Sequence, residues 1–238
     1  MRLDKFLVAT GCCSRSEAKK HARKGAVTVN GVAAKTSDMN IDENKDRVAF
    51  CGREIVYRRF TYVMLNKPEG VVSATEDGRD VTVLDLLPAD VRTRGMFPCG
   101  RLDKYTLGLM LLTDDGELGH KLLAPKSHVE KSYRFESAHG VSEEERQMLE
   151  SGVHIEGGYL TKPCRVVLDF EGASGGVITL REGKYHQIKQ MLEAVSNKIT
   201  YLERITFGPL VLDKALERGE WRMLSAEEEA ALRASVEK

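Results

Sequence analysis

Charged side chains stand immediately before an apolar run in the segment GRLDKYTLGLMLLTDDG, Gly100 to Gly116. Arg101, Asp103 and Lys104 belong to a polar stretch that follows a glycine. The apolar residues Leu109–Leu112 come next and predict a fully buried strand, which places Asp103 at the edge of the core. A carboxylate in this position can form a structural ion pair, cap a turn or do chemistry, and spacing alone does not choose among these roles.

A second polar segment, LREGKYHQIKQM, runs from Leu180 to Met191. It ends a strand at Gly183 and then begins a helix that is predicted over Tyr185–Val195. The polar residues around the start of that helix are Lys184, His186, Gln187 and Lys189. A buried aspartate needs a cationic partner if it is to stay ionised, and a helix of this kind offers one.

The composition excludes several classes of protein. The chain has 238 residues, of which 42% are hydrophobic and 30% charged, as in ordinary globular proteins. No run of about 18 apolar residues is present, so no membrane span is expected. The N-terminus is charged from its first residues and lacks the apolar segment of a secretory signal, so a cytoplasmic protein is expected.

Cysteine and histidine spacing gives no sign of a disulfide framework or a metal site. The five cysteines are scattered without a C-x-x-C pair, and the six histidines show no H-x-x-x-H or H-x-H spacing. The Gly-rich stretch GASGG, Gly172 to Gly176, lacks the spacing of a nucleotide-binding loop and is predicted to be a turn between two strands. No metal is therefore expected.

The charge is distributed unevenly along the chain, although the formal net charge is zero. Residues 1–60 contain 13 Lys and Arg against 7 Asp and Glu, so the remainder is acidic by the same margin. An average near zero thus conceals a basic N-terminal module.

The N-terminal module is predicted to contain a helix pair and a small hairpin. Ser14 and Glu17 have the spacing of a capping box, Gly25 is a helix stop, and Asn30-Gly31 is a preferred tight-turn dipeptide. The basic residues of the predicted helix are Arg15, Lys19, Lys20 and Arg23. Such a face suits a phosphate backbone, and a merely solvated face is the alternative.

A boundary near residue 60 is expected, after the basic connector IVYRRF, Ile55 to Phe60. It gives a module over 1–59 and a larger unit over 60–238. The larger unit has predicted strands at Tyr62–Leu65, Leu109–Thr113, Ser132–Glu136, Cys164–Phe170, Gly176–Arg181 and Leu202–Phe207. Its other predicted helices are Leu118–Leu123, Glu143–Leu149 and Ala226–Val236. Strands outnumber helices without alternating strictly, so the predicted class is α+β.

The N-terminal segment RLDKFLVATGCCSRSEAKKHARKGAVTVNG, Arg2 to Gly31, resembles the S4 RNA-binding domain. In that family the basic helix and the adjoining turn contact structured RNA. The resemblance therefore implies RNA contacts for Arg15, Lys19, Lys20 and Arg23.

The larger unit resembles the pseudouridine synthases, in the branch that joins an S4 domain to a catalytic domain. GRLDKYTLGLMLLTDDG matches the signature G-R-L-D-x-x-T-x-G-L-x-x-L-T-x-D-G, and LNKPEG, EKSYRF and EGKYHQIKQM follow the order of that branch. The last motif is nearest to the RsuA type, which acts on 16S ribosomal RNA. The implied catalytic fold has a mixed, mainly antiparallel sheet flanked by helices.

The resemblance implies the chemistry and the residues that perform it. These enzymes cleave the C1′–N1 bond of a uridine, turn the base and rejoin it through C5, using no cofactor. Asp103 matches the essential carboxylate, as nucleophile or base, and Lys189 matches the cation that keeps it charged. Tyr133 matches the tyrosine that packs on the flipped base, and Arg101 the arginine that fills the vacated place.

The remaining motif residues, His186, Gln187 and Arg204, are expected to bind RNA. The expected partner is ribosomal RNA, most simply 16S, either free or in a partly assembled small-subunit particle, with the protein as a monomer. Two alternatives stay open: the same chemistry on a 23S uridine, and a non-catalytic rRNA-binding assembly factor. Asp103→Asn separates the second alternative from an enzyme.

Overall fold

Two units make up the chain, Met1–Arg59 and Phe60–Lys238. The computed structural model describes residues 1–43, 45–55, 59–124, 126–127 and 129–237. Residues 56–58 of the expected basic connector lie outside the described residues.

The first unit packs two helices on a small antiparallel sheet. Its elements are α1 (Leu3–Ala9), α2 (Arg15–Arg23), β1 (Val27–Val29), β2 (Val32–Ala33), β3 (Val48–Phe50) and β4 (Arg53–Ile55), with strand order β2-β1-β3-β4. The predicted capping box is present, because Ser14 and Glu17 each accept a backbone hydrogen bond from the other. Asn30 and Gly31 both have positive φ, 52° and 81°, as the tight hairpin turn requires. The second hairpin, β3–β4, is not predicted by the sequence.

The second unit is built on a nine-stranded sheet of order β11-β12-β8-β13-β7-β5-β15, with β6 and β14 paired beside this path. The long strands are β5 (Tyr62–Lys67), β7 (Leu107–Thr113), β8 (Lys131–Ser137), β11 (Arg165–Leu168), β12 (Gly175–Leu180) and β13 (Ile199–Phe207). The short ones are β6 (Phe97–Pro98), β14 (Leu210–Val211) and β15 (Trp221–Met223). A separate two-stranded hairpin is formed by β9 (His154–Ile155) and β10 (Tyr159–Leu160). Within the described strands of this sheet, only β7 and β13 run parallel.

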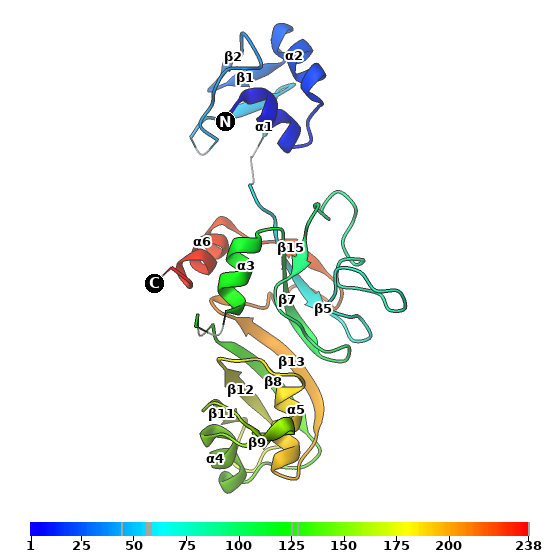
Figure 1. Cartoon of the computed structure of the whole chain (residues 1–238), viewed down its shortest axis with the longest axis vertical. Coiled ribbons are helices and arrows are strands. Elements are labelled where there is room, and N and C mark those ends of the chain that lie inside the picture. The colour runs from blue at the N-terminus through cyan, green and yellow to red at the C-terminus, as the bar shows by residue number, and fades with distance from the viewer. Residues whose placement is uncertain (44, 56–58, 125, 128, 238) are drawn as a thin grey trace. The chain divides into compact units, whose positions relative to one another are not determined.

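Both faces of this sheet are covered, which explains the continuous apolar run in β7. Met110 and Leu112 pack into one core with helices α4 (Glu143–Ser151) and α5 (Gln187–Ala194). Leu109 and Leu111 point to the opposite core, which contains α3 (Gly116–Leu123) and α6 (Ala226–Ala234). Figure 1 shows α3 and α6 together near the upper end of this unit. The α+β class with a mixed, mainly antiparallel sheet is confirmed.

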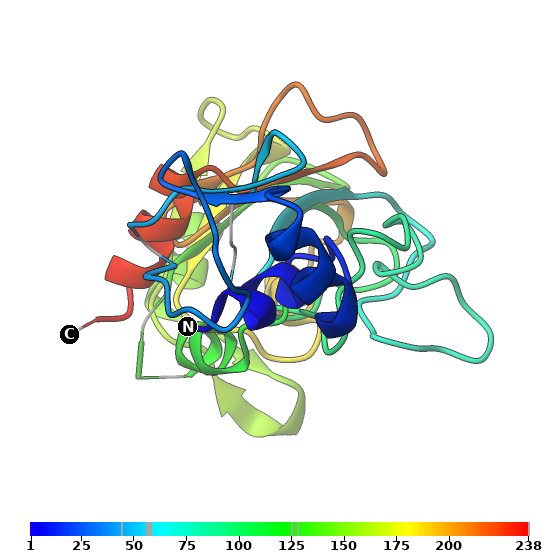
Figure 2. The same cartoon turned by 90° about the horizontal axis from the view of Figure 1, so that it is seen from above.

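A long connection over residues 68–96 leads from β5 to β6 and projects from the sheet in both views (Figures 1 and 2). Its apolar residues Val71, Val83, Leu84 and Leu87 are buried in the core that contains α5. Its Ser73 hydroxyl exchanges hydrogen bonds with the backbone of Leu102, at 2.8 and 3.0 Å. The connection therefore supports the loop that carries Asp103.

The predicted long strands and helices of this unit are present with small shifts of their ends. The capping boxes of α4 and α6 are formed, at Ser142–Glu145 and Ser225–Glu228. The predicted start of α5 at Tyr185 is wrong, because His186 is left-handed with φ 48° and the helix begins at Gln187. No helix in the described part of the chain is long and apolar enough to cross a membrane.

Candidate active site

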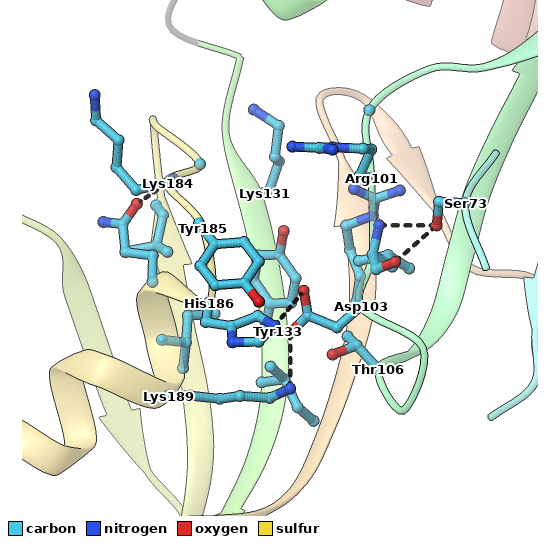
Figure 3. A pocket seen from close by; sticks show the side chains of 18 of the residues that line it. Ser73, Arg101, Asp103, Thr106, Lys131, Tyr133, Lys184, Tyr185, His186 and Lys189 are labelled. Carbon is cyan, nitrogen blue, oxygen red and sulfur yellow. Dashed lines mark hydrogen bonds and ion pairs between the residues drawn. The ribbon is translucent and has the colours of Figure 1, made fainter. Parts of the chain in front are cut away.

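A cavity of about 770 Å³ opens between the loop at residues 100–106, the end of β12 and the start of α5. The loop contributes Arg101 and Asp103, and strand β8 contributes Lys131 and Tyr133 to the wall. Figure 3 shows these side chains converging with His186 and Lys189 from α5 and its preceding turn. Segments far apart in the sequence thus meet at one cavity.

Each carboxylate oxygen of Asp103 faces a nitrogen-bearing side chain, one from Lys189 in α5 and one from His186 immediately before that helix. The Lys189 ammonium donates to Oδ2 at 2.7 Å, and Nε2 of His186 lies 3.5 Å from Oδ1. The Asp103 side chain is 28% exposed, so this ion pair is only partly screened by solvent. The left-handed backbone at His186 turns its imidazole toward the carboxylate before the helix begins. Such backbone conformations recur at functional sites.

The backbone of the Asp103 loop is held by a buried lysine. The ammonium of Lys67, on β5, donates to the carbonyl oxygens of Pro68, Asp103, Lys104 and Thr106 at 2.9 to 3.2 Å. Burial lowers the pKa of Lys67 to about 8, although the nearby Asp103 opposes the shift. Lys67 is fully buried, so its role is to fix the loop rather than to meet a ligand.

Strand β8 directs two functional side chains into the cavity, because residues two apart share a face of a strand. Tyr133 is 8% exposed, and its hydroxyl makes no hydrogen bond with another described residue. Burial, with a further contribution from the nearby Arg204, lowers the pKa of Lys131 to about 8. The cavity therefore combines an anion, several cations and an aromatic ring, which suits a flat polar ring attached to phosphate. Among the described residues, no group of His, Cys, Asp or Glu is placed to hold a metal ion.

Comparison with known sequences identifies both units. A sequence model described as RNA pseudouridylate synthase matches residues 61–194, and one described as S4 domain matches residues 1–46. The chain belongs to the RNA pseudouridylate synthase family. It is an RsuA-type synthase, an isomerase that acts on RNA.

Relatives of this synthase match over nearly the whole chain. An uncharacterized RNA pseudouridine synthase of Bacillus subtilis, YtzG, is 47% identical over 96% of each chain. The ribosomal small subunit pseudouridine synthase A of Vibrio cholerae is 38% identical over 98% of this chain and 99% of its own. A crystal structure of a pseudouridylate synthase superposes with a TM-score of 0.68 at 34% identity, covering 98% of this chain and 99% of that one.

The structure of this synthase brings several residues expected from the motifs to one cavity: Arg101, Asp103, Tyr133, His186 and Lys189. Arg101 is exposed at the rim and forms no hydrogen bond or ion pair with another described residue. Lys104, which the sequence set beside Asp103, instead pairs with Asp80 at 2.7 Å. His186 differs from the expectation, because its imidazole faces Asp103 as well as the cavity.

Two residues expected to contact RNA are buried at the edge of the cavity and have protein partners. Gln187 is 4% exposed, and its amide joins Glu182 Oε1 and the backbone N–H of Lys184 at 2.7 and 2.9 Å. Arg204 is 1% exposed and donates from Nε to the carbonyl oxygen of Leu109 at 2.7 Å. Both residues adjoin the cavity, but their polar groups are used to position the elements that form it.

The basic residues expected in the S4 domain lie on the open face of α2. The side chains of Arg15, Lys19, Lys20 and Arg23 are exposed, and none forms a hydrogen bond or ion pair with another described side chain. Ala18 and Ala22 occupy the buried face. The open face of the helix is therefore basic, although the nearby carboxylates of Asp4, Glu17 and Asp38 offset part of its charge.

Sequence reasoning missed the roles of Lys67 and Lys131. A signal was present for each: Lys67 follows the apolar run Val63–Leu65 within the strand that ends in LNKPEG, and Lys131 stands two residues before Tyr133 in EKSYRF. Alternation along a strand places Lys131 on the same face as Tyr133.

Proposed function

We propose that this enzyme isomerises a specific uridine of 16S ribosomal RNA to pseudouridine without a cofactor, with Asp103 as the essential carboxylate. The observation that carries the proposal is the 2.7 Å ion pair between Asp103 and Lys189 at the cavity that Tyr133 also lines. The 16S target is supported by the relatives called ribosomal small subunit pseudouridine synthase A.

The reaction moves one bond and one proton within the substrate. The C1′–N1 bond breaks, a C1′–C5 bond forms, the proton on C5 leaves and N1 gains a proton, so no external reactant is needed. Asp103 acts as an ionised nucleophile or base beside the ribose and base, and Lys189 stabilises its charge. Tyr133 packs on the flipped base, and its hydroxyl assists proton movement at C5. The walls restrict escape of the freed uracil.

We further propose a division of work between the two units. The exposed basic residues of α2 bind rRNA through its phosphates, and Arg101 fills the place left by the flipped nucleotide. The enzyme acts in the cytoplasm as a monomer on 16S rRNA, free or in a partly assembled particle.

The test offers small-subunit RNA that lacks the modification, as free RNA and as partly assembled particles, to purified enzyme. Pseudouridine is read as carbodiimide-dependent stops of reverse transcription. We expect one new stop with the parent enzyme and with Asp90→Asn, an exposed control that makes the same charge change. Asp103→Asn should lose the stop and retain RNA binding.

Other outcomes separate the alternatives. A stop on large-subunit RNA alone would replace the 16S target with a 23S uridine. Turnover that survives Asp103→Asn would remove Asp103 from the chemistry. RNA binding without a stop on either RNA would favour the assembly factor.

A further inference from the structure

A second hollow, of about 280 Å³, adjoins the catalytic cavity. The two share Lys184 and Tyr185, so these residues form a ridge between them. The other side of the hollow comes from the β9–β10 hairpin. Its lining consists of Ile155, Glu156, Gly157, Tyr159, Lys184, Tyr185 and Gln190. Because the hollows are adjacent, one RNA strand entering the cavity would also cross this ridge.

The walls of the hollow are fixed before any ligand arrives. Gln190 donates to the carbonyl oxygen of Tyr185 at 2.9 Å and accepts from the backbone N–H of Glu156 at 2.8 Å, which ties α5 to the hairpin. The Tyr159 hydroxyl donates to Glu182 at 2.7 Å. A site whose residues are already held loses less conformational entropy on binding.

Tyr185 has one covered ring face and one open face. Its ring stacks on the imidazole of His186, with centroids 3.8 Å apart and planes 20° apart. The residue is nevertheless 68% exposed. Figure 3 shows its ring on the α5 side of the cavity mouth. Isolated exposed aromatics are common on surfaces, but this one extends a stack that begins beside the catalytic carboxylate.

The charge beside the open ring also suits RNA. The Lys184 ammonium lies 4.3 Å from the centroid of the Tyr159 ring and forms no ion pair with a described residue. The amide of Gln190 is already occupied at both ends. The hollow thus offers aromatic rings, the Lys184 cation and, from the hairpin, the exposed carboxylate of Glu156. It has few free groups with which to read base edges.

We propose that this hollow binds the nucleobase next to the target uridine, by stacking on Tyr185, while Lys184 meets the adjoining phosphate. This rests on the proposed function, because it assumes that an RNA strand delivers a uridine to Asp103. The subsite holds the strand in register and recognises ring size more than base identity, because stacking is tolerant of sequence.

The test compares Tyr185→Ala, Tyr185→Phe and Phe170→Ala in initial-rate assays on the unmodified rRNA that the parent enzyme modifies. Phe170 is a matched control, because it is 71% exposed and follows β11, outside both hollows. We expect Tyr185→Ala to raise KM about tenfold with little change in kcat, because the variant loses the stacking contact with one base. Tyr185→Phe should restore KM, and Phe170→Ala should match the parent.

Three results would overturn the subsite. The first is a KM for Tyr185→Ala equal to that of the parent. The second is a decrease in kcat alone for Tyr185→Ala, which would mean that Tyr185 supports His186. The third is a KM for Tyr185→Phe as high as that of Tyr185→Ala, which would implicate the hydroxyl. An error in the proposed 16S target would be detected separately, because the parent enzyme would then modify another RNA. The KM values of the variants would in that case be compared on that RNA.

Discussion

Lys189 and Asp103 are 86 positions apart in the sequence, yet their charged atoms lie 2.7 Å from each other in a partly enclosed cavity. Lysine supplies one donor to one carboxylate oxygen, where an arginine would supply a fork. His186 occupies the side of the other oxygen. The carboxylate is thus paired on one side and still 28% exposed to the cavity.

Replacement of Lys189 by Met should lower turnover about tenfold or more, because it removes the ammonium that donates to Asp103 Oδ2 at 2.7 Å, and a hydrogen bond between charged groups contributes about 1.5 to 3 kcal/mol. Lys189→Arg should retain most activity, because it keeps the positive charge beside the carboxylate. Single-turnover rates of both variants on the same RNA make the comparison, and equal losses for Met and Arg would indicate a steric role instead.

Replacement of Lys67 by Met should loosen the Asp103 loop. It removes the donor shared by four carbonyl oxygens, of which only those of Asp103 and Lys104 keep a backbone donor from the loop contacts described. The free energy of unfolding should therefore fall by about 2 kcal/mol or more, and kcat should fall with it. Lys104→Met is the control, because its pair with Asp80 is partly exposed and should contribute less than about 1 kcal/mol. Urea unfolding and initial rates would show whether the two variants differ as expected.

Lys131 should make RNA affinity depend on pH. Its pKa of about 8 means that the charge is present at pH 7 and is lost as the pH rises through 8. KM should therefore rise between pH 7.0 and 8.6, by up to about tenfold if the ammonium meets a phosphate. Lys131→Arg stays charged and should flatten this rise, while Lys131→Met should show the high KM already at pH 7. Parallel curves for all three would exclude the contact.

Gly108→Ala should destabilise the sheet beside the active site. Gly108 has φ +96°, and an added Cβ would lie 2.3 Å from the backbone oxygen of Arg204 on β13. The expected loss in the free energy of unfolding is about 3 kcal/mol or more. Gly116→Ala, in the first turn of α3 with open space around it, should change stability by less than about 1 kcal/mol. Chemical denaturation of both variants makes the comparison.

Local features of the fold were predictable from the sequence. The capping boxes at Ser14, Ser142 and Ser225 each depend on residues three apart, and the turn at Asn30-Gly31 depends on two neighbours. Long-range features were not. No local pattern states that a helix near residue 189 meets a loop near residue 103, and only the family resemblance linked them.

The protein partners of Gln187 and Arg204 could not be predicted from the sequence. Polar residues beside a functional motif can face a ligand or satisfy buried backbone and side-chain partners, and residue type alone does not specify which. The left-handed conformation of His186, which ends the predicted helix start at Tyr185, also has no signal in its residue type.

Strand β13 lies between β8 and β7 in the sheet, so it is the shared neighbour of two groups of strands. The strands β7, β5 and β15 lie on one side of it, and the Asp103 loop leads directly into β7. The strands β8, β12 and β11 lie on the other side, and β8 carries Tyr133. During synthesis, these groups have no common strand until residues 199–207 have emerged from the ribosome. Pairing across such sequence distances is slow. We therefore expect the active site to be completed late in folding, so that a nascent chain that already contains every catalytic residue is not yet an enzyme.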